Sequence, residues 1–580
     1  MKQLCRRTAW LIAFLMTAVL YAFIALKMDV RFAMNDDAII QRALMGYETG
    51  RPAAFHLYTH GLLVWPMFVL YSLFPLLPWY AITQLALMFL ALTVIAKGLM
   101  QVFVRYGKPM WAGAVLAAAF FVAFGLEYVT QFTFTYTAAL LGAAAAAQVM
   151  SIDYAHASDR QIVCGMLGAA GLVSLCYAIR LDAPLPAIAY CGLAFLFVFW
   201  EHFGSGKKTR RNPRPMLVSL LLIAVVLGGM VGVRQIEMAV NASPEYTQWH
   251  NERSEALDYR GLSNVPQEAL DAAGWDETTL RLAQNWCFLD GDISTEALQT
   301  INDALEERDT RTVDDHLNDI KRIVRGRVTK SAYAFKIMAM AAIAGLAAFI
   351  GALFMKGRRL RLLFSLVCTA GGLLLMIVYL ALQGRLPLRA VSAAAMPAIV
   401  MTLCLLPACL PCTRISRLFL YAVTAAVLIH TLVSVAPLYR LLQRYPWTEA
   451  PGRAYAELES YAVQHPDCLY IADTEIATTD TNPFPSYPDG LPMNISYWGG
   501  WDMRSPASEA LFERFGLDVW DFGAESFLRE DVFLATTQAD PPQFLTDWIC
   551  AETANPITWD VIAHEGGIYI LHFRENGGST

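Results

Sequence analysis

Long apolar runs separated by short polar segments make up most of the chain between residues 8 and 437. Each run is close to the length of about 20 residues that an α-helix needs to cross a bilayer. Eleven runs are predicted to span the membrane: 8–27, 79–97, 110–127, 134–151, 162–179, 184–201, 216–233, 331–355, 362–382, 391–411 and 418–437. The pattern predicts an all-α polytopic membrane protein.

One further apolar run, Gly61–Phe74, is too short to cross comfortably and contains Pro66. If it did cross, every later loop would change sides, and the basic cluster Lys207–Arg214 would lie outside. Because short cytoplasmic loops carry an excess of Lys and Arg, we interpret Gly61–Phe74 as an interfacial or re-entrant helix on the outer surface.

A second helix is predicted before it, over about 36–48, in the same outer loop. Its apolar residues recur at helical spacing on one face: Ile39, Ile40, Ala43, Leu44 and Tyr47. We therefore expect two juxtamembrane helices that lie on the bilayer.

Two polar regions interrupt or follow the apolar runs. Residues 234–330 are predicted to form a mostly helical extracytoplasmic domain, which includes a charged helix in Leu305–Val328. Residues 438–580 are predicted to form a mixed α/β extracytoplasmic domain, with strands at Cys468–Thr474 and Gly566–Phe573, a helix at Ser508–Gly516 and a long loop between. The remaining divisions are an N-terminal transmembrane module, 1–233, whose first outer loop is 28–78, and the C-terminal transmembrane helices, 331–437.

Composition agrees with this organisation. Hydrophobic residues make up 56% of the 580 positions and charged residues only 16%, whereas a soluble protein has about a quarter charged residues. The Lys and Arg of the short loops place the N-terminus in the cytoplasm and the C-terminal domain outside, as in a bacterial cytoplasmic membrane. The sequence has no basic domain, so nothing in it suggests a nucleic-acid partner. Most of the 11 cysteines lie in apolar runs, whereas Cys468 and Cys550 lie in one soluble region and could pair in an oxidising compartment.

Two adjacent carboxylates, Asp36 and Asp37, open the first outer loop within about one helical turn of the expected lipid boundary. Asn35 or Asp36 could simply cap the following helix. Alternatively, one carboxylate could act as a general base or cation ligand. Only one is expected to face a site, because neighbouring helical residues point about 100° apart.

This arrangement resembles the GT-C fold of polyprenyl-phosphate-sugar-dependent membrane glycosyltransferases. The resemblance rests on Asp36-Asp37 after the first span, then Gly50–His60, Leu70–Pro75 and the cytoplasmic Lys97. The chain also resembles a group of bacterial GT-C-like membrane proteins in Gly46–Pro52, in Gly274–Asp290 and in the similar Gly499–Pro506. The resemblance implies that a sugar leaves a polyprenyl phosphate and that an aspartate of the pair, Asp36 or Asp37, activates the acceptor.

A departing phosphate needs cationic or N–H donors at the same outer level. Candidates lie in two short outer loops, where positive charges run against the usual bias. They are Arg180, with the adjacent Asp182, and Arg385 and Arg389. The alternative is an arginine that snorkels or forms an ion pair, for example Arg180 with Asp182.

Other polar residues at this level are Glu127, Gln131, His56 and His60, which could line the same site or be ordinary loop and interface residues. An aromatic belt at the membrane surface accounts for Tyr58, Trp65, Trp79 and Tyr80. In the C-terminal loop, Trp498, Trp501, Asp502 and Arg504 suggest either a sugar-stacking lid or a structural wrap.

The sequence thus favours an integral-membrane glycosyltransferase that transfers a sugar from a polyprenyl-phosphate donor to an envelope glycan or lipid acceptor outside the membrane. Alternatives are a transporter or flippase for an envelope lipid and a non-catalytic assembly protein. No cofactor is firmly implied, although a divalent cation remains open.

Overall fold

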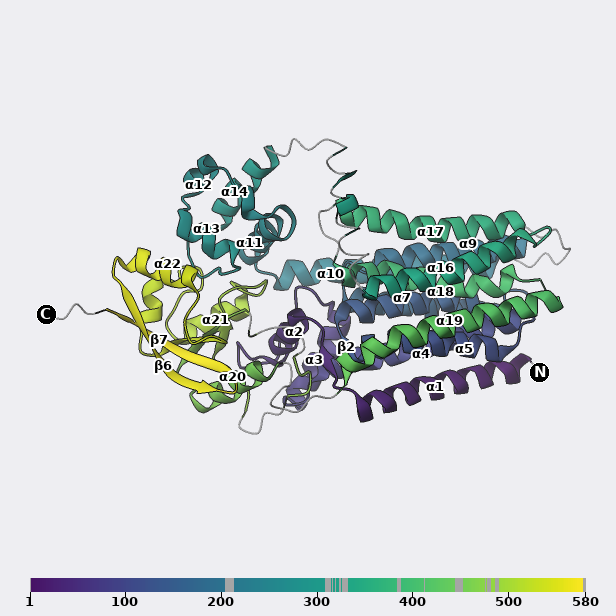
Figure 1. Ribbon diagram of the computed structural model, residues 1–580, viewed down its shortest axis with the longest axis horizontal. Helices are drawn as coiled ribbons and strands as arrows, with labels where there is room; N and C mark the ends of the chain where they lie inside the picture. The colour runs from purple at the N-terminus through teal and green to yellow at the C-terminus, as the bar shows by residue number, and fades with distance from the viewer. Residues whose placement is uncertain are drawn as a thin grey trace.

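The computed structural model describes residues 2–203, 213–307, 332–382, 387–411, 413–443, 452–474, 481–485 and 490–576, together with 314, 317, 318, 320–322, 325 and 476. The apolar helices run side by side in one half of the molecule, and the soluble parts lie together at the other end (Figure 1). In the described part of the chain, 11 helices are long and apolar enough to cross a membrane. This confirms the predicted multi-pass helical architecture.

The membrane helices correspond one to one with the predicted spans. The third span is a continuous helix made of α5, a π-helical turn at Phe121–Gly125 and α6. Their bounds are α1 Lys2–Lys27, α4 Trp79–Arg105, α5 Met110–Phe120, α6 Leu126–Thr130, α7 Phe134–Ser151, α8 Asp159–Ile179, α9 Pro184–Phe203, α10 Arg214–Asn241, α16 Ala332–Leu353, α17 Arg359–Leu382, α18 Leu388–Cys409 and α19 Arg414–Leu442.

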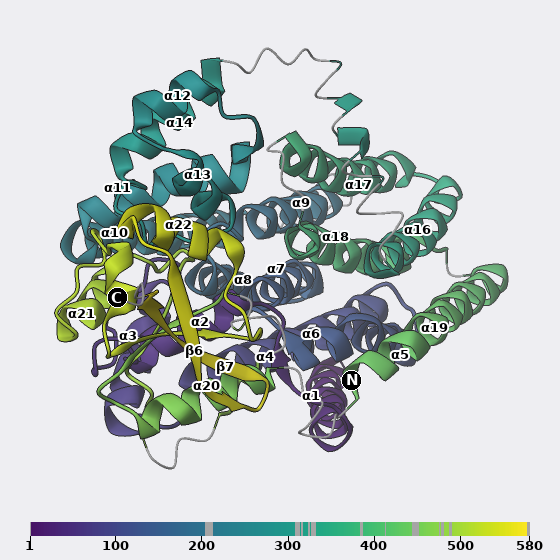
Figure 2. The same ribbon diagram turned by 60° about the vertical axis from the view of Figure 1, so that its left-hand side comes forward.

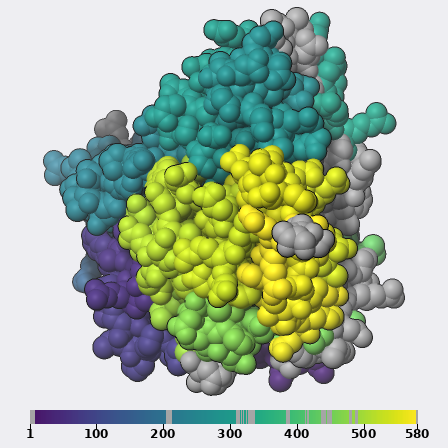
Figure 3. Space-filling model, turned by 90° about the vertical axis from the view of Figure 1, so that its left-hand side faces the viewer, coloured from purple at the N-terminus to yellow at the C-terminus, as the bar shows by residue number. Residues whose placement is uncertain are grey.

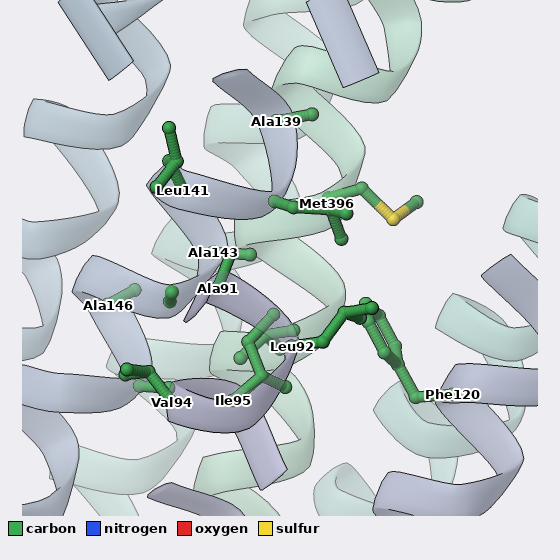
Figure 4. Packing of buried hydrophobic residues seen from close by; sticks show 14 of the residues in the cluster. Ala91, Leu92, Val94, Ile95, Phe120, Ala139, Leu141, Ala143, Ala146 and Met396 are labelled. Atoms are coloured by element: carbon green, nitrogen blue, oxygen red, sulfur yellow. The ribbon is translucent and has the colours of Figure 1, made fainter. Parts of the chain in front are cut away.

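The alanine-rich helix α7 lies at the centre of this bundle and packs against α4, α8, α9 and α18. Its small side chains let the neighbouring backbones approach closely. A Cβ added at Gly142 would lie 2.9 Å from the Cβ of Ala187 on α9. Figure 4 shows the resulting contacts among alanines of α7, aliphatic residues of α4 and Met396 of α18. Helix α7 is therefore packed against other helices on nearly every side.

The short apolar run forms α3, Gly61–Leu73, which has 13 residues. At the rise of an α-helix it is about 20 Å long, less than the hydrocarbon core of about 30 Å. Met67 and Tyr71 pack inward, whereas Trp65, Phe68 and Leu73 are exposed. An apolar face exposed on a helix too short to span agrees with the predicted helix on the membrane surface.

Helix α2, Asn35–Met45, differs from the expected surface-lying helix because it is buried on most sides. Ile40 and Leu44 belong to the core of the membrane helices. Ile39 belongs instead to a cluster formed with the C-terminal domain. The helix is therefore enclosed between two cores, and its polar residues Gln41 and Arg42 are buried as well.

A small parallel sheet of two strands, each two residues long, fixes the position of the loop that leads into α2. Strand β1, Arg31–Phe32, pairs with β2, Gln131–Phe132, in the turn between the third and fourth spans. This pairing brings the start of α2 next to the start of α7, although the two are about a hundred residues apart in the chain.

The C-terminal domain contains a five-stranded mixed sheet in the order β4-β3-β5-β7-β6. Strand β3 is parallel to β4 and β5, and β7 is antiparallel to β5 and β6. The bounds are β3 Leu469–Ala472, β4 Ile495–Tyr497, β5 Val532–Thr536, β6 Ile557–Glu565 and β7 Ile568–Glu575, with helices α20 Arg453–Gln464, α21 Pro506–Arg514 and α22 Gln543–Thr553. The predicted strands and helix correspond to β3, β7 and α21. The predicted long loop contains the unforeseen β4.

The helical domain between α10 and α16 contains α11 Pro244–Arg253, α12 Gln267–Ala273, α13 Glu277–Gln284 and α14 Thr295–Glu307. Most of the predicted charged helix at Leu305–Val328 lies outside the described residues. This domain and the C-terminal domain lie against each other at one end of the molecule (Figures 2 and 3).

The two outer domains share one hydrophobic core. The Arg504 guanidinium is buried and donates hydrogen bonds of 2.7 Å to the carbonyls of Asp290 and Ile293. A Cβ on Gly499 would lie 1.6 Å from the Trp286 carbonyl oxygen, so this approach requires glycine. The similar segments Gly274–Asp290 and Gly499–Pro506 are thus packed together, and Arg504 has a structural role. Cys468 and Cys550 are both free.

Candidate active site at the outer membrane surface

Asp37 is completely buried at the start of α2. Its Oδ1 accepts hydrogen bonds from Tyr80 Oη at 3.0 Å, from Gln84 Nε2 at 2.8 Å and from the Phe134 amide at 2.9 Å. Gln84 is held in turn by the Thr137 hydroxyl, which donates to its Oε1. The carboxyl group therefore joins α2, α4 and α7.

Burial raises the pKa of Asp37 to about 6, although hydrogen bonds from Thr133, Gln84 and the Phe134 amide act in the opposite direction. A carboxyl in this environment changes its charge close to neutral pH.

Neither carboxylate caps α2 through a side-chain hydrogen bond. The N-cap residue is Met34, with an extended backbone, and both aspartates lie in the first turn. Locally, the Asn35 side chain accepts a bond from the Asp36 amide at 3.0 Å. Asp37 instead accepts from the amide of Phe134, on a different helix, so the simple capping explanation does not describe it.

The side chain of Asp36 contacts a different group from the side chain of Asp37. Its Oδ2 lies 3.4 Å from Nη1 of Arg389, and both side chains keep about a fifth of their surface exposed. Arg389 lies in the first turn of α18, which begins after Pro387. The two adjacent aspartates thus differ, because Asp37 is enclosed and Asp36 is accessible.

Arg180 ends α8 and lies beside this pair. Its Nη1 donates to the Thr135 hydroxyl, and its guanidinium lies 4.8 Å from the centre of the Phe134 ring. Burial and the positive charge of Arg389 lower the pKa of Arg180, whereas Asp182 and Asp36 raise it. Asp182 is itself exposed. The structure therefore brings Asp36, Asp37, Arg180 and Arg389 together at the start of α7.

Two other candidates on the 126–135 turn have different neighbours. Glu127 forms an ion pair of 2.5 Å with Lys336 at the start of α16. Gln131 is half-buried in β2, opposite Arg31. The part of this turn that reaches Asp37 and Arg180 is the segment Thr133–Thr135. Arg385 lies outside the described residues.

His60 is the N-cap of α3. Its Nδ1 accepts a bond from the Leu62 amide at 2.9 Å, and its Nε2 lies 2.9 Å from the Met230 carbonyl of α10. Both ring nitrogens are occupied. Next to it, the Gly61 amide donates to Glu237 at 3.2 Å. Helix α10 thus runs beyond its predicted end to hold this loop.

His56 is buried, and its Nδ1 accepts a bond from the Tyr58 amide at 3.2 Å. Burial and the nearby Arg234 lower its pKa to about 3, so the ring is neutral. The ring lies 5.5 Å from that of Trp501 in the C-terminal domain. His56 therefore faces the C-terminal domain.

Sequence reasoning missed several residues that hold the site. Tyr80 was assigned to an aromatic belt, but it is completely buried and bonded to Asp37, so that assignment is wrong. Gln84 carried a usable signal, because a polar side chain inside an apolar span generally has a function. Thr133 and Phe134 had none, because Phe134 contributes through its backbone amide.

No group of three or more His, Cys, Asp or Glu side chains in the described residues could hold a metal ion. The polar groups of the site are instead suited to an anion beside a carboxylate, because Arg180 and Arg389 supply two guanidinium groups.

Searches against known protein families and curated proteins found no match. Among solved structures, the chain is similar to ArnT from Cupriavidus metallidurans in the apo state, with 14% identity and a TM-score of 0.39, over 97% of this chain and 98% of that one. It is also similar to ArnT from the same organism bound to undecaprenyl phosphate, with 13% identity and a TM-score of 0.40, over 99% and 100% of the two chains.

Proposed function

We propose that the chain is an integral-membrane glycosyltransferase of GT-C type that uses a polyprenyl-phosphate-linked sugar at the outer surface of the membrane. The observation that carries the proposal is the convergence of two arginines and an accessible carboxylate, Asp36, at the outer ends of the membrane helices. A donor of this kind has an anionic phosphate at the membrane surface and a sugar bonded to it.

The two arginines are suited to the phosphate. Arg180 and Arg389 are close enough for the charge of Arg389 to lower the pKa of Arg180, yet both remain guanidinium ions. A phosphate between them would relieve this repulsion and accept bidentate hydrogen bonds. As the sugar–phosphate bond breaks, negative charge on the departing phosphate increases, and the same groups would stabilise it.

Asp36 is suited to act as the general base. It keeps 22% of its side-chain surface exposed, whereas Asp37 is enclosed and already accepts three hydrogen bonds. A base must lie within hydrogen-bond reach of the proton that it takes. We therefore assign Asp36 as the general base and Asp37 as a positioning residue that fixes the first turn of α2 against α4 and α7.

In the proposed step, an acceptor hydroxyl attacks the anomeric carbon of the donor sugar. A new glycosidic C–O bond forms while the C–O bond to the phosphate breaks, and its electron pair leaves with the polyprenyl phosphate. The acceptor proton moves to Asp36. Arg180 and Arg389 hold the leaving phosphate, and the exposed apolar face of α3 keeps the loop at the depth at which a lipid-borne donor would arrive.

The first test is binding of undecaprenyl phosphate to the purified full chain by native mass spectrometry. Arg389→Gln and Arg180→Gln should each weaken binding by about tenfold or more, which corresponds to about 1.4 kcal/mol for one charge-assisted contact. Asp36→Asn should leave lipid binding within about threefold. The matched control, Asp271→Asn, removes a carboxylate from α12.

The second test is transfer of the sugar, measured by glycan and lipid profiling of cells that carry each variant. Asp36→Asn should abolish the product while the protein remains folded and still binds the lipid. Full activity in Asp36→Asn would exclude Asp36 as the base. Movement of a lipid across liposome membranes without any sugar transfer would instead support a flippase.

A further inference from the structure

An aromatic cluster, formed by His56, Tyr58, Trp501 and His250, lies where three parts of the chain meet. The Tyr58 ring is 4.9 Å from that of Trp501, and its hydroxyl lies 2.8 Å from His250 Nε2 on α11. The first outer loop, the helical domain and the C-terminal domain each contribute to it.

This cluster is within electrostatic range of the proposed base. The charges of Asp36 and Asp182 raise the pKa of Tyr58, although burial has the larger effect. Burial also raises the pKa of Asp502, as do the nearby carboxylates Glu48 and Asp36. The charge of Asp36 thus acts on groups from two different parts of the chain.

Two buried polar atoms next to Trp501 have no hydrogen-bond partner within the described part of the chain. One is His56 Nε2 and the other is Asp502 Oδ1. The His56 ring is neutral and its Nδ1 accepts a bond, so Nε2 carries the proton and is a donor. Asp502 Oδ1 is an acceptor. A buried polar atom left unpaired costs about 1–3 kcal/mol, which is a reason to expect a ligand here.

Trp501 is only partly buried, and the centre of its ring lies 5.5 Å from that of His56. The rings of His56 and Tyr58 meet it at interplanar angles of 88° and 90°, so neither is stacked parallel on it. Its position is fixed by the Trp501 carbonyl, which accepts a hydrogen bond of 2.5 Å from the Tyr246 hydroxyl.

A partly buried indole with an orphan donor on a neighbouring ring and an orphan acceptor on the next residue matches the chemistry of a sugar ring. The C–H face of a pyranose packs on an aromatic ring, whose face is electron-rich. Its hydroxyls donate and accept at once, so they can satisfy both atoms. A hydrocarbon ligand would leave both atoms unpaired, and a phosphate lacks the apolar C–H face that packs on an indole.

We infer that Trp501, Asp502 and His56 form a carbohydrate-binding subsite at the junction of the first outer loop and the C-terminal domain, through which this domain determines which sugar reaches the reacting centre. This inference rests on the proposed function. The sugar comes either from the donor lipid or from the acceptor, since both present the same ring and hydroxyl groups.

The test is saturation-transfer-difference NMR on the full chain in lipid nanodiscs, which are free of glycoside detergents. The probes are the methyl pyranosides of glucose, galactose, mannose, N-acetylglucosamine and arabinose. We expect at least one to bind the wild type. Trp501→Ala should raise its dissociation constant by about tenfold or more, Trp501→Phe should have a smaller effect, and Asp502→Asn should change which probe binds best.

The matched control is Trp111→Ala, because this half-exposed tryptophan lies at the start of α5, among the loops assigned to the cytoplasm. If no probe binds the wild type, or if Trp501→Ala binds all probes as tightly as Trp111→Ala does, the subsite is disproved. Undecaprenyl phosphate binding should be the same in wild type and Trp501→Ala. A failure of that lipid to bind the wild type would count against the proposed function instead.

Competition separates the two sources of the sugar. If undecaprenyl phosphate glucose displaces the bound glycoside and undecaprenyl phosphate does not, the subsite takes the donor sugar. If neither lipid displaces the glycoside, the subsite takes the acceptor. Displacement by undecaprenyl phosphate alone would place the probe in the phosphate site and overturn the inference.

Discussion

The guanidinium of Arg42 on α2 donates a hydrogen bond of 2.6 Å to the hydroxyl of Tyr497 on β4. A second bond of 3.2 Å runs to the Ile495 carbonyl. Burial lowers the pKa of Arg42, but the surrounding Tyr455, Tyr497 and Glu459 outweigh this and raise it. The helix that carries both aspartates is thus attached to the C-terminal sheet through one buried cation.

Arg42→Leu should therefore be among the most damaging substitutions outside the site. It would leave the buried Glu459 without its cation and the buried Glu48 with Arg514 alone, and we expect a loss of about 3–5 kcal/mol of stability. Tyr497→Phe removes one hydrogen bond and should cost about 1–2 kcal/mol. Thermal unfolding in nanodiscs measures both, and equal melting temperatures for Arg42→Leu and wild type would contradict this role.

The pH dependence of stability should reveal Asp37. Its pKa is raised from 3.8 to about 6, so its contribution is fully present below pH 4 and is lost as the pH rises through 6. Asp37→Asn does not ionise and keeps its oxygen as an acceptor. The melting temperature of Asp37→Asn relative to wild type should therefore increase between pH 4 and pH 7 and stay constant above. A difference that does not change with pH would contradict the raised pKa.

Gly61→Ala should destabilise the outer loop. A Cβ at this position would lie 1.9 Å from Glu237 Oε1, so Glu237 would have to move away from the Gly61 amide. We expect a cost of about 1–3 kcal/mol. The matched control is Gly171→Ala on α8, where no atom lies within 4 Å of the added Cβ. That change should be neutral or stabilising by up to about 1 kcal/mol, because alanine is the better helix former. Equal effects of the two substitutions would rule out a specific role for Gly61.

The ion pair between Lys336 and Glu127 should behave as a unit. Lys336→Met leaves the Glu127 carboxylate without its cation and should be strongly destabilising. The double variant Lys336→Met/Glu127→Gln removes the charge as well, and we expect it to recover a large part of the loss. A double-mutant cycle of melting temperatures measures this coupling. Additive effects would show that the two residues act independently.

Much of the architecture could be predicted from the sequence because lipid imposes a simple length rule. Each predicted span corresponds to a helix. The distribution of Lys and Arg among the short loops predicts that α3 does not cross the bilayer. The rule ceases to apply at the loops. The spacing of apolar residues predicts one buried face of α2. The buried Arg42, however, donates a hydrogen bond to Tyr497, which is 455 positions further along the chain. Local patterns contain no information about such a partner.

The candidate site, too, could be predicted from the sequence only in part. Asp36, Arg180 and Arg389 could be placed at one depth, because each adjoins the end of a span. Their mutual contacts could not, since these depend on how α7, α8 and α18 pack. The same holds for the role of Tyr80, because an interface tyrosine and a buried tyrosine bonded to Asp37 have the same local sequence pattern.

The hydrogen bonds made by the segment that contains β1 have a consequence for the order of assembly. The Asp29 amide donates to the Leu442 carbonyl, and the Phe32 amide donates to the Thr481 carbonyl at 2.9 Å. The segment that leads into α2 is therefore completed by residues from the last quarter of the chain. During synthesis, which proceeds from the N-terminus, this early loop must wait for the last domain of the chain. A chain that stops before residue 481 would insert its helices and still lack a contact that completes the segment leading into α2.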